Sequence, residues 1–171
     1  MKKVITLLMV ITLLVSGYAM AELPITKVDK VNPNDEIFMD MALTSAKASV
    51  GEGGLPCGAV VILNGALRSA GQPTDVATAE ETAIAMSRRK KLSFGVIYTI
   101  NEPTSQAYNA ICRSGVEKVY FVNPKEVVIA KGIYPAEAYE ESKIDTTLVK
   151  VPMNCMDFSE AERFIANYKN K

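Results

Sequence analysis

An apolar segment followed by Asn64-Gly65 is the feature that most constrains the fold of this chain. Residues 57–63 are continuously apolar, and residues 66–71 can pair back onto them because Asn-Gly is the strongest two-residue signal for a β-hairpin. Two further short apolar segments, residues 96–100 and 119–122, each follow a segment of helical composition. Strands that alternate with helices after a hairpin predict an α/β fold. We expect a three-layer α/β/α sandwich with a mixed sheet of about five strands.

The other elements are predicted from capping residues and composition. Helices are expected where an Asn, Asp, Ser or Pro opens a helical stretch, which gives residues 35–50, 79–91, 103–114, 135–142 and 159–169. The last helix is expected to begin with a capping box, with Ser159 as the cap and Glu162 three residues later. Residues 147–151 predict the fifth strand.

The N-terminal residues have the three parts of a secretory signal peptide. Lys2 and Lys3 form a positive region, residues 4–15 are almost entirely apolar, and Ala19 and Ala21 are the small residues that a signal peptidase reads. The apolar segment is shorter than the roughly 20 residues that a transmembrane helix needs. The sequence therefore predicts export, and an uncleaved anchor is the alternative.

The domain organisation follows from that cleavage site. We expect a signal peptide at residues 1–21, an extended lead-in at residues 22–34 and a single domain at residues 35–171. The expected localisation is periplasmic or secreted, with no stable membrane anchor after cleavage. A homo-oligomer is left open.

Charge and composition exclude several classes of function. The chain has 19 basic and 19 acidic residues, and it has no histidine. A neutral chain without a basic block lacks the electrostatic footprint of a nucleic-acid binder, so no nucleic-acid partner is expected. The absence of histidine excludes a serine nucleophile activated by histidine and every metal site that uses imidazole.

Three cysteines leave two alternatives. In an oxidising compartment Cys112 and Cys155 can form a disulfide, with Cys57 as a free thiol. Alternatively, all three are small buried apolar residues. The sequence does not supply the Cα geometry that a disulfide requires, so the choice between these alternatives waits for the structure.

Several sequence segments occur in the order that is typical of one enzyme superfamily. After the first helix come Pro-Cys-Gly-Ala-Val-Val at residues 56–61, the Asn-Gly hairpin, Thr-Ala-Glu-Glu-Thr-Ala-Ile at residues 78–84, and Tyr-Thr-Ile-Asn-Glu-Pro at residues 98–103. Over residues 35–125 the chain resembles the cytidine and nucleobase deaminases, and it is most similar to their guanine deaminase and tRNA adenosine deaminase branch. The resemblance implies a cytidine-deaminase-like fold and a pocket that holds catalytic zinc.

The residues at the zinc positions are the wrong types for zinc. Zinc deaminases carry His-x-Glu or Cys-x-Glu at one helix start and Pro-Cys-x-x-Cys at the next. The corresponding ligand positions in this chain are Thr78, Thr104 and Ala107. Zinc in proteins is bound by thiolate, imidazole or carboxylate, so we expect no metal and no cofactor. Cys57 with Glu80 would be a minor alternative site.

The frame of the family's pocket is retained in part. Glu80 lies at the position of the glutamate that transfers protons in the deaminases, and a simple helix-start carboxylate is the alternative interpretation. Gln72 lies beside Pro73, which stands where the family has a base-binding asparagine. The expected ligand-binding residues are those that the resemblance places around the pocket: Cys57, Gly58, Ala59, Gln72, Thr78 and Thr104.

Two functional hypotheses follow. The first is an exported, non-catalytic pseudoenzyme that acts by binding a small polar or heterocyclic ligand or a protein partner. The second is a hydrolytic nucleobase or nucleoside deaminase, or another hydrolase, with an atypical site around Glu80 and Cys57.

Overall fold

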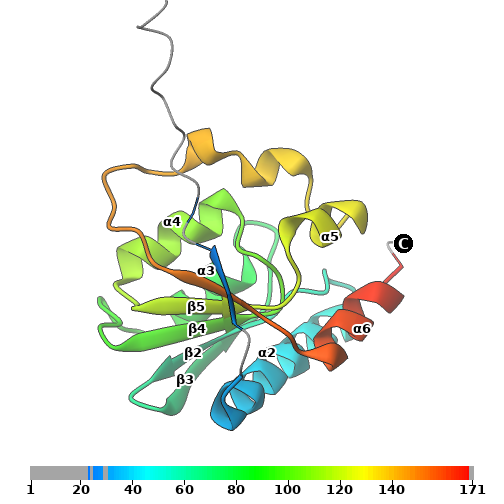
Figure 1. The fold of residues 1–171 in the computed structure, drawn as a ribbon, viewed down its shortest axis with the longest axis horizontal. Helices are drawn as coiled ribbons and strands as arrows, with labels where there is room; N and C mark the ends of the chain where they lie inside the picture. Colours follow the sequence, from blue (N-terminus) through cyan, green and yellow to red (C-terminus); the bar gives the residue numbers. More distant parts are fainter. Residues whose placement is uncertain (1–22, 24, 29–30, 170–171) are drawn as a thin grey trace, which may run out of the picture.

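A mixed six-stranded sheet forms the centre of the protein (Figure 1). The computed structural model describes residues 23, 25–28 and 31–169. The predicted signal peptide lies outside the described residues and stays a prediction. The strands are β1 (Ile25–Val28), β2 (Ala59–Leu63), β3 (Ala66–Gly71), β4 (Gly95–Thr99), β5 (Lys118–Phe121) and β6 (Met153–Met156).

The strand order in the sheet is β1-β6-β5-β4-β2-β3. The first four strands in this order are parallel to one another, and β2 runs antiparallel to both β4 and β3. The structure therefore confirms an α/β fold with a mixed sheet. The sheet has six strands rather than five, because residues 25–28 of the predicted lead-in pair with β6.

Helices cover the sheet on both sides. The long helix α2 (Pro33–Gly51) and the last helix α6 (Ser159–Asn167) lie on one side in Figure 1, and α4 (Ser105–Ser114) lies on the other. The remaining helical elements are α3 (Ala79–Met86), α5 (Lys125–Ala130) and two 3₁₀ helices, η1 (Ala136–Tyr139) and η2 (Glu141–Lys143). Among the described residues, no helix is both long and apolar enough to cross a membrane.

The hairpin prediction is confirmed. Asn64 and Gly65 both have positive φ, at 54° and 74°, and they join β2 to β3. A two-residue turn of this kind requires positive φ at both positions, which Asn and Gly adopt most readily. β2 is buried along almost its whole length because β3 and β4 flank it and helices cover it.

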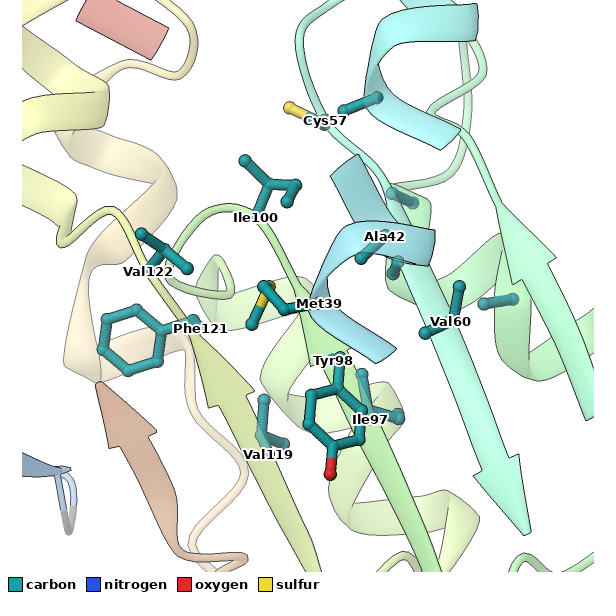
Figure 2. Close-up of a cluster of buried hydrophobic side chains, with 14 of the residues drawn as sticks. Met39, Ala42, Cys57, Val60, Ile97, Tyr98, Ile100, Val119, Phe121 and Val122 are labelled. Atoms are coloured by element: carbon teal, nitrogen blue, oxygen red, sulfur yellow. The ribbon is translucent and has the colours of Figure 1, made fainter. Parts of the chain in front are cut away.

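The core on the α2 side fixes that helix on the sheet. Figure 2 shows Met39 and Ala42 of α2 next to side chains of β2, β4 and β5, and both are fully buried. The hydroxyl of Tyr98 in β4 donates to Asp35 at the start of α2 over 2.5 Å. Tyr98 also stacks on Tyr120, with 5.0 Å between the ring centroids.

The predicted strand at residues 147–151 is wrong. The strand that follows is β6, between β1 and β5, and it begins at Met153, two residues after the predicted strand ends. The amide and hydroxyl of Thr147 donate to the carboxylate of Asp145, and the Leu148 amide donates to the Asp145 carbonyl. These local bonds hold residues 145–148 in a turn, so the β-branched residues there do not enter the sheet.

Several helix boundaries also differ from the prediction. α3 ends at Met86 because Arg88 has a φ of 53°, which no continuing helix can contain. α6 ends at Asn167, and its cap position is Phe158, so the expected capping box of Ser159 and Glu162 does not form. Residues 135–142 contain 3₁₀ turns instead of one helix, and α5 was not predicted.

All three cysteines are free thiols in the structure. Cys57 is buried, and Cys112 and Cys155 are half-buried. The thiol of Cys155 lies 3.6 Å from the carbonyl oxygen of Val122. The structure therefore has no bond between Cys112 and Cys155, and of the three cysteines only Cys57 is buried as the second alternative expects.

Candidate functional site

The start of α3 is built around a capping box. The Thr78 hydroxyl accepts a hydrogen bond from the Glu81 amide at 3.4 Å, and the Glu81 carboxylate accepts one from the Thr78 amide at 2.9 Å. Reciprocal bonds of this kind satisfy two backbone donors that a helix start leaves free. The first position at which the resemblance would place a zinc ligand therefore serves as a helix cap.

The start of α4 also has a threonine cap, but without the reciprocal side-chain bond. The Thr104 hydroxyl accepts from the Ala107 amide at 3.2 Å, and Thr104 is the cap residue of the helix. Gln106 reaches back and donates to both oxygens of Glu81, at 2.9 and 3.1 Å. The helix starts that carry Thr78, Thr104 and Ala107 thus lie next to each other, as the resemblance implies.

The residues at these helix starts do not fit zinc. Alanine has no ligand atom, and the two threonine hydroxyls accept backbone hydrogen bonds from their own helices. Within the described residues, no group of three or more His, Cys, Asp or Glu side chains is arranged to hold a metal ion. Threonine hydroxyls are poor substitutes for the thiolate, imidazole or carboxylate that zinc requires.

Glu80 is in the first turn of α3, and it is 6% exposed. Its Oε1 accepts a 2.6 Å hydrogen bond from the hydroxyl of Thr99, the last residue of β4. Burial raises the pKa of Glu80, while hydrogen bonds from Thr99 and Thr78 lower it by less. A raised pKa favours the protonated carboxyl, which can both donate and accept a hydrogen bond.

Cys57 is the second buried reactive group, and it is 4% exposed. Burial raises the pKa of its thiol to about 12, although hydrogen bonds with Tyr134 and Asn101 lower it in part. The Asn101 amide nitrogen lies 3.3 Å from the Cys57 sulfur and 3.1 Å from the Pro56 carbonyl oxygen. At neutral pH this thiol is protonated, and only a thiolate is a strong nucleophile or metal ligand.

Asn101 has an unpaired acceptor in the same region. The residue is 3% exposed, and its Oδ1 is a buried side-chain oxygen of the described residues that has no hydrogen-bond partner. An unpaired buried acceptor costs free energy, about 1–3 kcal/mol in typical proteins. A water, an ion or a ligand with an N–H group can supply the missing donor.

Gly58 and Ala59 have packing roles. A Cβ on Gly58 would lie 2.4 Å from backbone atoms of Ala42 and Ala46, so α2 packs directly on this residue. Ala59 is fully buried in β2 between Gly71 and Thr99.

Gln72 directly follows β3, and the loop after it lies on a different part of the surface. Pro73, Thr74 and Asp75 line a groove of about 840 Å³ together with the end of α6. Neither Gln72 nor Pro73 is among the residues that line the cavity at the starts of α3 and α4.

A segment with no motif covers the buried groups. Residues 131–150, which we call the strap, place Tyr134 beside Cys57 and bring the Tyr139 hydroxyl to the Glu102 carbonyl at 3.2 Å. Tyr134 lines a cavity of about 380 Å³ with Thr78 and Thr104. Sequence reasoning missed both tyrosines, because their distance along the chain from every motif gave no signal that they would contact it.

Solved structures with the same fold are deaminases. A tRNA:A34 deaminase that performs A-to-I editing has a TM-score of 0.61 and 22% identity, covering 75% of this chain and 98% of its own. The guanine deaminase of Nitrosomonas europaea has a TM-score of 0.64 and 19% identity, covering 81% of this chain and 85% of its own. The guanine deaminase of Bacillus subtilis has a TM-score of 0.59 and 26% identity, covering 82% of this chain and 98% of its own.

These similarities confirm the resemblance at the level of the fold. The chain has the cytidine-deaminase-like fold, in the form found in guanine and tRNA adenosine deaminases. No protein-family model and no curated protein sequence matches it.

Proposed function

We propose that this protein is an exported, non-catalytic member of the deaminase fold that binds a small polar or heterocyclic ligand in the inherited pocket. The observation that carries the proposal is the use of Thr78 and Thr104 as helix caps at the positions where the fold's enzymes would hold zinc. Ala107, at the third position, offers no ligand atom. Without a metal to lower its pKa, water in such a pocket supplies almost no hydroxide at neutral pH.

The polar groups around the pocket support a neutral heterocyclic ligand. The Cys57 thiol and the tyrosine hydroxyls carry no charge at neutral pH, and burial favours the uncharged form of Glu80 by raising its pKa. Together they offer both donors and acceptors. Heterocycles with adjacent N–H and ring nitrogen or carbonyl groups match such a set. One of the similar solved structures was determined with 8-azaguanine, which belongs to this class.

The enzyme hypothesis remains the alternative, with an atypical site around Glu80 and Cys57. It requires the Cys57 thiolate as a nucleophile or Glu80 as a base. The raised pKa of the Cys57 thiol works against a thiolate nucleophile at neutral pH.

The Glu80→Gln variant separates the two hypotheses. In a deaminase this carboxylate transfers the proton between water and base, so its loss would nearly abolish turnover. We expect no ammonia release from cytosine, guanine, adenine or their nucleosides by the natural protein, and none by Glu80→Gln. Turnover by the natural protein that disappears in the variant would refute the non-catalytic proposal.

The same variant has an expected pH signature that does not depend on finding a ligand. Because the folded state raises the pKa of Glu80, this carboxyl contributes stability that is present below its unfolded pKa and is lost as the pH rises through its folded pKa. Glutamine does not titrate. The free energy of unfolding of Glu80→Gln, measured in urea, should stay within about 1 kcal/mol of the natural protein at pH 4 and increase relative to it toward pH 8. Glu102, whose pKa is also raised, is present in both proteins and cancels.

Export is part of the proposal. The positive region, apolar segment and Ala-x-Ala site predict that cells release a chain beginning at Glu22. Intact-mass analysis of the exported protein checks this. A full-length product that stays in the membrane fraction would contradict it.

A further inference from the structure

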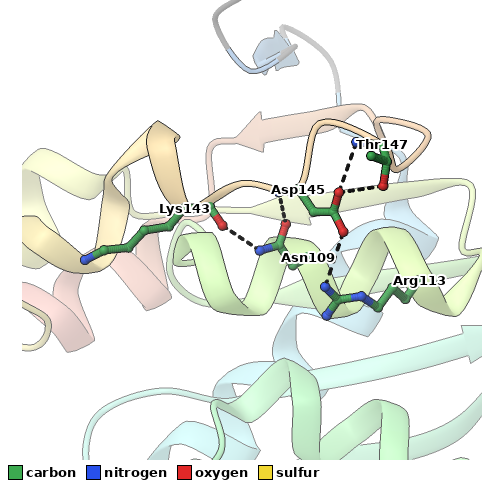
Figure 3. Close-up of polar contacts among 5 residues, drawn as sticks. All are labelled: Asn109, Arg113, Lys143, Asp145 and Thr147. Atoms are coloured by element: carbon green, nitrogen blue, oxygen red, sulfur yellow. Dashed lines mark hydrogen bonds and ion pairs between the residues drawn. The ribbon is translucent and has the colours of Figure 1, made fainter.

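The strap closes the inherited pocket and is attached mainly through α4. Figure 3 shows Asn109 of α4 donating to the Lys143 carbonyl at 2.8 Å and accepting from the Asp145 amide at 2.8 Å. Arg113, one turn further along α4, forms a 3.5 Å ion pair with the Asp145 carboxylate. The Ser105 hydroxyl donates to the Glu140 carbonyl at 2.8 Å. These bonds lie at or near the surface, where their net contribution to stability is small.

The strap has little regular structure of its own. Its described elements are the short 3₁₀ helices η1 and η2, and it adds no strand to the sheet. Ile133 is buried in the core, and Tyr134, Tyr139 and Ile144 pack against it. Outside these apolar contacts the strap is held by partly exposed polar bonds, and a segment of this kind opens at a lower free energy than the strands of the sheet.

Tyr134 is the strap residue that contacts both the cavity and a buried group of the pocket. Its side chain is a hydrogen-bond partner of the Cys57 thiol, and the nearby Cys57 and Glu80 help burial to raise the pKa of its hydroxyl. The same residue lines the 380 Å³ cavity beside Thr78 and Thr104. The Tyr134 ring thus lies between that cavity and the buried groups of the pocket.

Asn101 offers a buried acceptor beside Cys57, because its Oδ1 has no donor among the described residues. The Asn101 amide nitrogen donates hydrogen bonds to the Pro56 carbonyl and the Cys57 sulfur, but no group donates to its side-chain oxygen. A ligand with an N–H group would supply that donor. Such a ligand must replace what covers Cys57, and Tyr134 covers it.

We propose that Tyr134 is a built-in occupant of the inherited pocket, and that a heterocyclic ligand enters only when the strap lifts and Tyr134 leaves. This inference rests on the proposed function for the identity of the ligand, but the occupancy by Tyr134 can be tested separately. Binding that requires a minor open state is weakened by the fraction of molecules that are open. Removal of the Tyr134 side chain removes that penalty.

The test compares Tyr134→Ala with Tyr120→Ala. Tyr120 is a matched control because it is also half-buried but stacks on Tyr98, which contacts α2 rather than the pocket. The probe p-cresol has the shape of the lost side chain. It should raise the melting temperature of Tyr134→Ala by about 2 °C or more, and leave the natural protein and Tyr120→Ala unchanged. Calorimetry should show that 8-azaguanine binds Tyr134→Ala about tenfold or more tightly than the natural protein.

The outcomes separate this inference from the proposed function. No effect of p-cresol on Tyr134→Ala would overturn the occupancy by Tyr134. Equal affinity of the natural protein and Tyr134→Ala for 8-azaguanine would overturn the inference but support the proposed function. Stabilisation by p-cresol without 8-azaguanine binding to any variant would support the occupancy and count against the proposed function.

A milder variant covers the case in which Tyr134→Ala does not fold. Tyr134→Phe keeps the ring and loses only the hydroxyl that bonds to Cys57. It should bind 8-azaguanine about threefold or more tightly than the natural protein. Unchanged affinity, or no binding, would then overturn the inference.

Discussion

Replacement of Gly71 by alanine is expected to lower the free energy of unfolding by about 3 kcal/mol, which is a large part of the stability of an ordinary domain. A Cβ at this position would lie 2.2 Å from the Ala79 carbonyl oxygen and 2.4 Å from the Ala83 amide nitrogen. Both are backbone atoms of α3, so no side-chain rotation can relieve the clash. α3 would have to move away from β3.

The glycine at the end of α2 provides a matched control. Nothing lies within 4 Å of a Cβ on Gly51, and its φ is not positive. Gly51→Ala is therefore expected to change the free energy of unfolding by about 0.5 kcal/mol or less, with a slight gain from helix propensity. Urea unfolding curves of the two variants and the natural protein check both values. Equal midpoints for Gly71→Ala and the natural protein would show that α3 does not pack against β3 as described.

A displaced α3 also has a consequence for the pocket. Glu80 is in the first turn of α3, and its carboxylate meets Thr99 at the end of β4. Movement of α3 would lengthen that 2.6 Å contact. The glycine that permits close helix packing thus also positions Glu80, because helix placement and the position of its first-turn side chains are coupled.

The sequence predicted best the features that depend on neighbouring residues. Asn64-Gly65 specified a turn of known backbone geometry, and Pro103 marked the start of α4 to within two residues. In each case the signal and the structure lie within a few residues of each other. Neighbouring residues were therefore sufficient to predict these features.

Features that depend on distant partners were missed. β6 has the sequence Met-Asn-Cys-Met, with little β propensity, and it is a strand because β1 and β5 flank it. Tyr134 is more than 50 residues from Glu80 along the chain. Its place over the pocket depends on the path of the strap across α4, which no local pattern encodes.

The three positions that correspond to zinc ligands were predicted from the sequence only in part. The ordered motifs located Thr78, Thr104 and Ala107, and the residue types argued against a metal. What the sequence did not reveal is the use of the threonine hydroxyls. They cap α3 and α4, and a threonine cap typically contributes about 1 kcal/mol to stability. The exchange of a metal ligand for a cap retains the positions of both helix starts.

Restoration of the ligands should therefore restore metal binding. In a variant that combines Thr78→His, Thr104→Cys and Ala107→Cys, we expect about one zinc ion per chain after dialysis, and far less than one in the natural protein. The two helix starts are held together by the bonds between Glu81 and Gln106, which the variant leaves in place. Loss of the threonine caps costs about 1 kcal/mol for each helix. Zinc binding to the folded state offsets this cost through mass action.

Elemental analysis of the purified proteins measures the metal directly, and it requires no assumption about activity. The control carries Thr104→Cys and Ala107→Cys but keeps Thr78, so it has two thiols and no third restored ligand. It should retain little zinc. If the triple variant binds no zinc, the three substituted positions must lie further apart than a zinc site of the deaminase fold requires. Stoichiometric zinc in the natural protein that is lost in Cys57→Ser would instead favour an enzyme with an atypical site, because that thiol would then have to bind as a thiolate despite its burial.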